Sequence, residues 1–130
     1  MKLSTRARYG LRVCFLLGVS GGTVSLTKLS EQSDLSFKYL EQLMMKLRKA
    51  KIVDSLRGLN GGYSLSKPPS EITVSDILDA MGDNFEYNCD TSCEDKYCPN
   101  KRIFRKLAES IGSVLRQTTL QDMIDDYRCV

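Results

Sequence analysis

The feature that most constrains the fold of this chain is a pair of short helical patterns separated by a tight turn. The first covers about residues 26–32 and follows Ser25, a residue type that commonly caps helices. Residues 33–35 supply the turn, and Ser36 can cap a second helix. The second helix carries an apolar stripe at spacings of three and four residues, formed by Leu40, Leu43, Met44 and Leu47. This arrangement predicts a helix-turn-helix.

A β-hairpin is expected directly after the helix pair. Two β-prone segments, residues 52–57 and 63–66, flank a turn around Asn60-Gly61-Gly62. Pro68 and Pro69 then end the ladder, because proline has no N–H to donate. A hairpin in this position is the wing of a winged helix-turn-helix.

Helical patterns also flank this unit. A first helix is expected from its cap, Ser4, to about Val19, with an apolar side formed by Leu11, Cys14, Phe15 and Gly18. Thr73 and Asp76 form a capping-box pattern, which predicts a short helix that ends near Met81.

A long amphipathic helix is expected near the C-terminal end. It covers about residues 100–117, or roughly 27 Å at 1.5 Å per residue. Its apolar stripe consists of Ile103, Phe104, Leu107, Ile111, Val114 and Leu115. Because a small preceding unit cannot bury such a helix, we expect it to meet a second copy of the chain. Thr118 or Thr119 can cap a last turn that carries Leu120, Met123 and Ile124.

The predicted fold class is therefore mainly α with a small β-hairpin. Residues 1–81 form a winged helix-turn-helix domain for DNA binding, and residues 82–99, which show little periodicity, form a cysteine-bearing sensor loop. Residues 100–130 form the dimerisation helix and a C-terminal tail.

Basic residues are concentrated in the first half of the chain. Residues 1–67 hold 12 Lys and Arg against 4 Asp and Glu, a net charge of +8, whereas residues 68–130 hold 7 against 12, a net of −5. A basic half is typical of a protein that binds a polyanion, most often nucleic acid; a solvated basic face is the alternative. No apolar run reaches about 18 residues and the first residues do not form a secretory signal, so we expect a cytoplasmic protein without a membrane segment.

Three of the five cysteines, Cys89, Cys93 and Cys98, lie close together in the pattern C-x3-C-x4-C. Thiolates are soft ligands that suit zinc, copper(I) and iron–sulfur clusters. A structural zinc knot, a thiol redox switch and three incidental thiols are the alternatives. Cys14 lies on the apolar side of the first helix, where we expect it to be buried, and Cys129 is one residue from the end of the chain.

Four stretches carry a resemblance to a known family. They are M-K-L-S-T-R-A-R-Y-G-L-R at the start, Y-L-E-Q-L-M-M-K-L-R-K-A-K-I-V at 39–53, S-L-R-G-L-N-G-G-Y-S-L at 55–65 and P-P-S-E-I-T-V-S-D-I-L at 68–78. The chain resembles the small bacterial winged-helix regulators that include the iron–sulfur cluster regulator, the nitric-oxide-sensing repressor and the cysteine-metabolism repressor. The resemblance implies a homodimeric DNA-binding regulator whose long helix swaps across the dimer.

The resemblance also implies an iron–sulfur cluster. Cys89, Cys93 and Cys98 occupy the loop in which cluster-binding members carry three cysteine ligands, and we expect 2Fe–2S in preference to 4Fe–4S. The chain has no histidine, so the His ligand of one branch is missing, and Lys101 stands at the matching position. Arg8 stands where another branch has a carboxylate. The fourth ligand is therefore open, and the candidates are Asp90, Glu94, Cys129, Cys14, solvent and a small thiol.

DNA-contacting side chains are expected on the second helix of the pair and on the wing. The candidates are Ser36, Lys38, Tyr39, Glu41, Gln42, Lys46, Arg57 and Gly58. Glu41 can accept a hydrogen bond from a cytosine amino group in the major groove, and Tyr39 and Lys46 can reach the DNA backbone. Arg57 suits a narrow minor groove. In the family, the Glu, Gln and wing Arg positions are those used for readout.

These observations predict a sequence-specific transcriptional regulator, in the first place a repressor. It binds a pseudo-palindromic operator in double-stranded DNA as a homodimer, and its Fe–S cluster modulates that binding. The alternatives are the same regulator sensing through zinc or thiol oxidation, and a non-DNA protein that passes metal to partners. An enzyme is not expected, because the chain lacks histidine, a nucleophile motif and a phosphate-binding glycine pattern.

Overall fold

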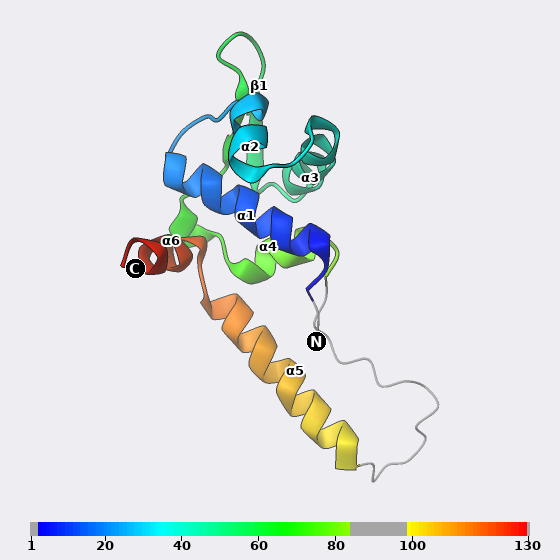
Figure 1. Cartoon of the computed structure of the whole chain (residues 1–130). Coiled ribbons are helices and arrows are strands. Elements are labelled where there is room, and N and C mark those ends of the chain that lie inside the picture. Colours follow the sequence, from blue (N-terminus) through cyan, green and yellow to red (C-terminus); the bar gives the residue numbers. More distant parts are fainter. Residues whose placement is uncertain (1–2, 84–98, 130) are drawn as a thin grey trace.

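The computed structural model describes residues 3–83 and 99–129 of the 130-residue chain. Helix α1 lies across the middle of the molecule, with α2, α3 and the hairpin on one side and α4 and α6 on the other (Figure 1). The elements are α1 Thr5–Ser20, α2 Leu26–Ser33, α3 Phe37–Lys49, β1 Val53–Leu56, β2 Gly62–Leu65, the 3-10 turn η1 Pro69–Glu71, α4 Val74–Ala80, α5 Pro99–Gln117 and α6 Leu120–Arg128.

Short-range hydrogen bonds determine where most of these helices begin. The hydroxyls of Ser4, Ser25 and Ser36 each accept the backbone N–H three residues further along, which satisfies one of the donors left free at a helix N-terminus. Thr73 forms the predicted capping box with Asp76. At the last helix Thr119, rather than Thr118, is the cap, and it forms a second capping box.

The helix-turn-helix prediction is confirmed in its geometry. Asp34 ends α2 in the left-handed conformation with φ of 60°, and the Ser30 hydroxyl donates to the Leu35 carbonyl at 2.6 Å to hold the turn. The predicted stripe of α3 is completely buried, and it consists of Leu40, Leu43, Met44 and Leu47. Each of these side chains contributes about 1.5–3 kcal/mol to holding α3 against the core.

The hairpin is present, and its loop is shifted by one residue from the 58–62 connection that the predicted segments leave. Strands β1 and β2 pair antiparallel from Val53 opposite Leu65 to Leu56 opposite Gly62, which leaves the five residues 57–61 as the loop. Val24 also exchanges two backbone hydrogen bonds with Tyr63, at 2.8 and 2.9 Å. A side chain at Gly62 would collide with the Val24 backbone, so glycine is required for this close approach. The bridge at Val24 ties the hairpin to the segment before α2.

The predicted apolar side of α1 was partly wrong. Leu11, Phe15 and Gly18 are only half-buried, and of the predicted set Cys14 alone is buried. The buried face consists of Ala7, Gly10, Val13, Cys14 and Leu17. Because α1 contacts α2, α3, α4, α6 and β2, small residues are needed on the face where these elements approach most closely.

Helix α6 is more than the predicted last turn. It is a nine-residue helix that packs on α1 and buries Leu120 and Ile124. Two backbone hydrogen bonds hold its start: Leu120 N–H donates to Ile72 at 2.8 Å and Val74 N–H donates to Thr118 at 2.9 Å. The preceding helix, α5, projects away from the rest of the molecule (Figure 1). No residue of α5, every one of which the structure describes, is buried within this chain.

Candidate nucleic-acid interface

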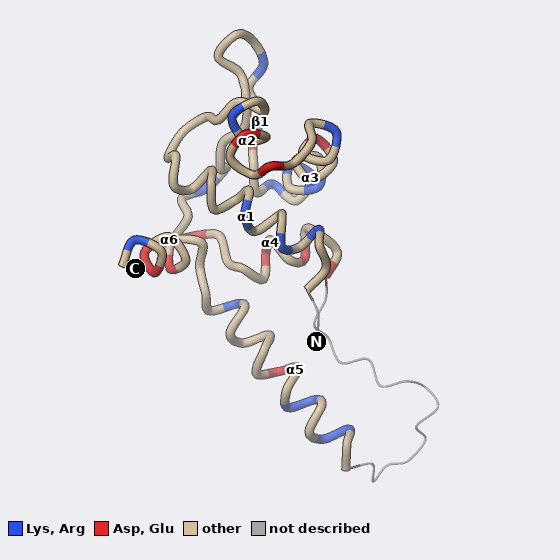
Figure 2. Tube along the Cα trace, in the orientation of Figure 1, with Lys and Arg blue, Asp and Glu red and all other residues tan. Residues whose placement is uncertain are grey.

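The outer face of α3 carries the predicted DNA-reading side chains. Lys38, Glu41 and Gln42 are exposed on the side away from the buried stripe, and Lys46 is half-buried. Ser36, the cap that precedes α3, is also exposed. Lys and Arg recur along α1, α3 and the hairpin loop, whereas Asp and Glu gather on α6 (Figure 2). The structure thus presents donors, acceptors and positive charge on one helix face that is free of contact with the core.

Tyr39 has a structural role besides the predicted contact with the DNA backbone. It is half-buried, and its ring meets that of Tyr9 edge to face, with centroids 5.9 Å apart and an interplanar angle of 86°. Edge-to-face aromatic pairs contribute about 0.5–1.5 kcal/mol beyond the area they bury. This pair connects α3 to α1 and helps fix the orientation of the helix.

The hairpin loop lies at the same end of the molecule as α3, away from α5 (Figure 1). Arg57 is the first residue of the loop and is exposed. Gly58 follows with φ of 115°, a conformation that side chains rarely adopt, so the glycine shapes the loop beside Arg57. Leu59 is fully exposed at the tip. Leu59 was not among the predicted site residues, although it is an apolar residue within a glycine-rich loop of the sequence.

The N-terminus of α1 is connected to Asp83, which directly precedes the cysteine segment, residues 84–98. Ser4 N–H donates to the Asp83 carboxylate at 2.9 Å. This hydrogen bond lowers the pKa of Asp83, and the charge of Arg6 contributes in the same direction. No sequence pattern predicted this contact, because the two residues are far apart in the chain.

Comparison with known proteins identifies the family to which this chain belongs. The family model described as "Rrf2: Iron-dependent Transcriptional regulator" matches residues 3–126. The chain belongs to the Rrf2 family. The structure of CymR, the global cysteine regulator of B. subtilis, has a TM-score of 0.85 at 34% identity, with 96% of this chain and 97% of that chain covered. The structure of T. potens IscR has a TM-score of 0.80 at 37% identity, with 98% and 88% covered.

A curated relative gives the same result from sequence. The HTH-type transcriptional regulator IscR of Cereibacter sphaeroides is 35% identical over 135 residues, which cover 95% of this chain and 87% of the relative. As an Rrf2-family member, the chain is a DNA-binding transcriptional regulator. The resemblance, the winged-helix fold and the prediction of a regulator rather than an enzyme are therefore confirmed.

The structure describes two of the five cysteines of this Rrf2-family chain, Cys14 and Cys129. Cys89, Cys93 and Cys98 lie outside the described residues, as do the fourth-ligand candidates Asp90 and Glu94. Cys14 is completely buried, as predicted, and burial raises the pKa of its thiol to about 12. A thiol in that environment stays protonated and is a poor metal ligand. Cys129 is exposed at the end of α6.

Residues 3–83 and 99–129 offer neither a metal site nor a membrane span. No group of three or more His, Cys, Asp or Glu side chains is placed there to hold a metal ion. No helix in those ranges is both long and apolar enough to cross a membrane.

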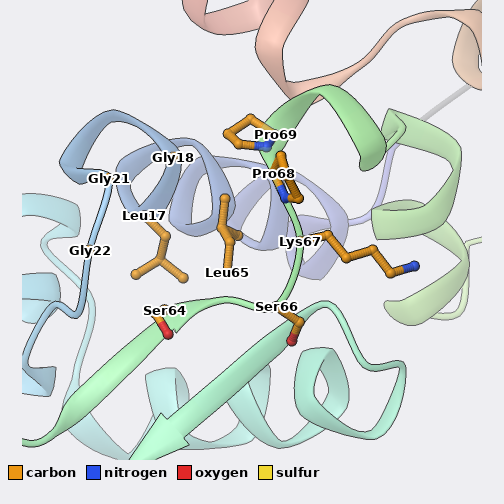
Figure 3. A pocket seen from close by; sticks show the side chains of 10 residues that line it. All are labelled: Leu17, Gly18, Gly21, Gly22, Ser64, Leu65, Ser66, Lys67, Pro68 and Pro69. Carbon is orange, nitrogen blue, oxygen red and sulfur yellow. The ribbon is translucent and has the colours of Figure 1, made fainter.

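One hollow lies between the C-terminal end of α1 and the end of β2 (Figure 3). Its volume is about 350 Å³, and Leu17, Leu65 and Pro68 present apolar groups to it. Ser66 also lines it, and the Ser66 hydroxyl is buried without a hydrogen-bond partner among the described residues. The hollow contains no acid–base pair or set of metal ligands.

Proposed function

We propose that this Rrf2-family regulator is a homodimeric repressor that acts in the cytoplasm on a pseudo-palindromic operator. The recognition surface consists of Ser36, Lys38, Tyr39, Glu41, Gln42, Lys46, Arg57 and Gly58. The observation that supports this most is the exposed polar face of α3 beside a basic wing, at the end of the molecule opposite α5. Glu41 and Gln42 read base edges in the major groove, and Arg57 enters the adjacent minor groove.

The apolar stripe of α5 supports dimerisation. Ile103 is 50% exposed, Leu107 47% and Val114 61% within this chain. An amphipathic helix that buries none of its residues exposes a continuous apolar surface to water, which is costly. A second copy supplies an identical stripe and buries both. The division of the chain at residues 81 and 99 remains a prediction that this arrangement favours.

The chemistry of the cysteine segment supports an Fe–S cluster. Cys89, Cys93 and Cys98 offer three thiolates within ten residues, which are three of the four ligands that a 2Fe–2S or 4Fe–4S cluster takes, and we favour 2Fe–2S over 4Fe–4S. When bound, the cluster supplies a redox-active centre whose stability depends on iron and oxygen. The fourth ligand comes from outside α1, because Cys14 is enclosed in the core. Zinc binding and thiol oxidation use the same residues and are the alternatives.

Contacts on either side of the cysteine segment explain how its state can affect DNA binding. Asp83, before the segment, holds the N–H of Ser4, the cap of α1. Helix α1 in turn holds α3 through the pair of Tyr9 and Tyr39. Pro99, after the segment, is the first residue of α5. Cluster binding by the segment thus constrains both the reading helix and the dimer helix.

One experiment tests the cluster and DNA binding separately. The protein is purified anaerobically, its absorption spectrum is recorded, and its iron, sulfide and zinc are measured. We expect a thiolate-to-iron band for wild type and for Cys14→Ala, because Cys14 is enclosed in the core, and no such band for Cys93→Ser. Operator affinity between about 50 and 200 mM salt should fall by orders of magnitude for a protein with several phosphate contacts. Protein that contains zinc but no iron would indicate a zinc site in place of the cluster. Operator binding that does not depend on salt would favour the metal-carrying alternative.

A further inference from the structure

One large apolar side chain interrupts the polar outer face of α3. Met45 is 67% exposed. At about 100° per residue it lies roughly 150° around the helix from the centre of the buried stripe. Its neighbours on that face are Lys38, Gln42 and Lys49, all of them exposed. Single exposed apolar residues are ordinary on protein surfaces, so the significance of Met45 rests on where it lies.

Met45 lies one helical turn beyond two proposed base readers. It follows Glu41 by four residues and Gln42 by three, and these spacings place side chains next to one another. One turn advances about 5.4 Å along a helix, whereas successive base pairs are about 3.4 Å apart. A side chain at this position therefore reaches one to two base pairs beyond those that Glu41 and Gln42 contact.

The charge around Met45 decides what covers it. On the outer face Lys49 lies one turn beyond Met45 and Lys38 lies two turns before it. Arg48 is three residues further along, and Glu41 is the one acidic neighbour in this helix. A basic surround attracts a polyanion and disfavours an apolar protein groove. The major groove of DNA is negatively charged and accepts a helix. At a thymine it also presents an apolar group, because thymine alone has a methyl group there.

We propose that Met45 is a specificity-determining residue that contacts the C5-methyl group of a thymine in the operator. This inference rests on the proposed function. The flexible, polarisable thioether can pack on the methyl group and remove both from water. Met45 thus supplies a preference for a T·A base pair at one operator position. Glu41 and Gln42 do not reach that position with hydrogen bonds.

Replacing thymine by deoxyuridine, which removes only the methyl group, tests this directly. Duplexes that bind the anaerobically purified chain are selected from a randomised library. The tightest is resynthesised with deoxyuridine at each thymine of one half-site in turn, and affinities are measured by fluorescence anisotropy. For wild type, one substitution should weaken binding about fourfold, the value for one buried methyl group. Met45→Ala should bind the thymine duplex correspondingly less well and show no difference between thymine and deoxyuridine.

Two variants control for general damage. Met45→Leu keeps an apolar side chain and should retain the discrimination. Leu59→Ala removes another exposed apolar side chain, from the wing, and should leave it unchanged, because the methyl group projects into the major groove. Met45 is largely exposed, so Met45→Ala should fold, and circular dichroism checks this.

The outcomes separate this inference from the proposed function. If the library yields no preferred sequence, the proposed operator binding is wrong and Met45 loses its role with it. A second outcome is that a sequence is selected and that Glu41→Gln changes the selected sequence, while Met45→Ala keeps the wild-type sensitivity to deoxyuridine. In that case the readout by Met45 is wrong and the proposed function stands. An operator without any methyl-sensitive thymine overturns the inference in the same way.

Discussion

The carboxylate of Asp83 accepts the backbone N–H of Ser4 at 2.9 Å, so the residue that precedes the cysteine segment is bonded to the cap of α1. Ser4 lies at the start of α1, which contacts most elements of the core. Asp83 is followed directly by the cysteine segment. The bond is partly buried and carries the charge of the Asp83 carboxylate, so its strength depends on pH.

Asp83 should contribute to the acid sensitivity of the fold. Because the pKa of Asp83 is lowered in the folded state, its contribution is fully present above the ordinary Asp pKa of about 3.9 and is lost as the pH falls through the lowered value. Asp83→Asn should therefore show a shallower loss of stability than wild type below about pH 4. Urea unfolding between pH 3 and 6 measures this. Asp79→Asn, an exposed aspartate on α4, is the matched control and should follow wild type.

Ser36 combines a structural role with a proposed DNA contact, and two substitutions separate them. Its hydroxyl accepts Tyr39 N–H at 3.2 Å, so Ser36→Ala should cost about 1 kcal/mol of stability. Ser36→Asp preserves the cap but places a negative charge at the DNA, so it should retain stability and weaken operator binding. Thr119→Ala removes a cap from α6 and should lower stability without the direct loss of a DNA contact. Wild-type affinity in Ser36→Asp would place residue 36 away from the DNA.

Glu41 should determine base preference more than affinity. A carboxylate repels phosphate but accepts a hydrogen bond from cytosine, so Glu41→Ala should relax selectivity at one base pair by about 1–3 kcal/mol. Affinity for non-specific DNA should stay the same or rise. Competition binding with single-base operator variants measures both effects. An unchanged preference at every position would contradict readout by Glu41.

Arg57 should matter most where the operator has an A·T-rich minor groove. Arg57→Ala should weaken binding to such sequences and lower the slope of log affinity against log salt by about 1. Titrations over several salt concentrations measure the slope. Arg128→Ala removes an exposed arginine from α6 and should leave the slope unchanged. If Arg57→Ala and Arg128→Ala lowered the slope equally, the loss would reflect the net charge of the protein rather than a contact between the wing and DNA.

The α5 stripe should control oligomeric state. Leu107→Asp places a charge in the middle of the stripe and should shift the protein from dimer to monomer at micromolar concentration, with a corresponding loss of operator affinity. Arg105→Asp introduces the same carboxylate on the polar side of α5 and should remain dimeric. Sedimentation velocity measures both. A monomeric wild type would remove the basis for the dimer helix.

Local chemistry explains why much of the fold was predictable. The caps at Ser4, Ser25, Ser36 and Thr73 depend on hydrogen bonds between residues three apart, which a sequence displays directly. The stripe of α3 was also correct, because α3 packs on the core through one continuous face. The proposed reading residues Lys38, Glu41 and Gln42 follow from that stripe, since they occupy the opposite side.

Only the tertiary structure decided which face of α1 is buried, that α6 returns to α1, and that Asp83 meets Ser4. Helix α1 is surrounded by five other elements, so small residues such as Ala7 and Gly10 are buried where those elements come closest, and a hydrophobic stripe read from sequence misses them. The other two contacts join residues far apart in the chain, and long-range packing determines them. The sequence by itself determined the local elements and the donor set of Cys89, Cys93 and Cys98; the packing around α1 decided how these elements are joined.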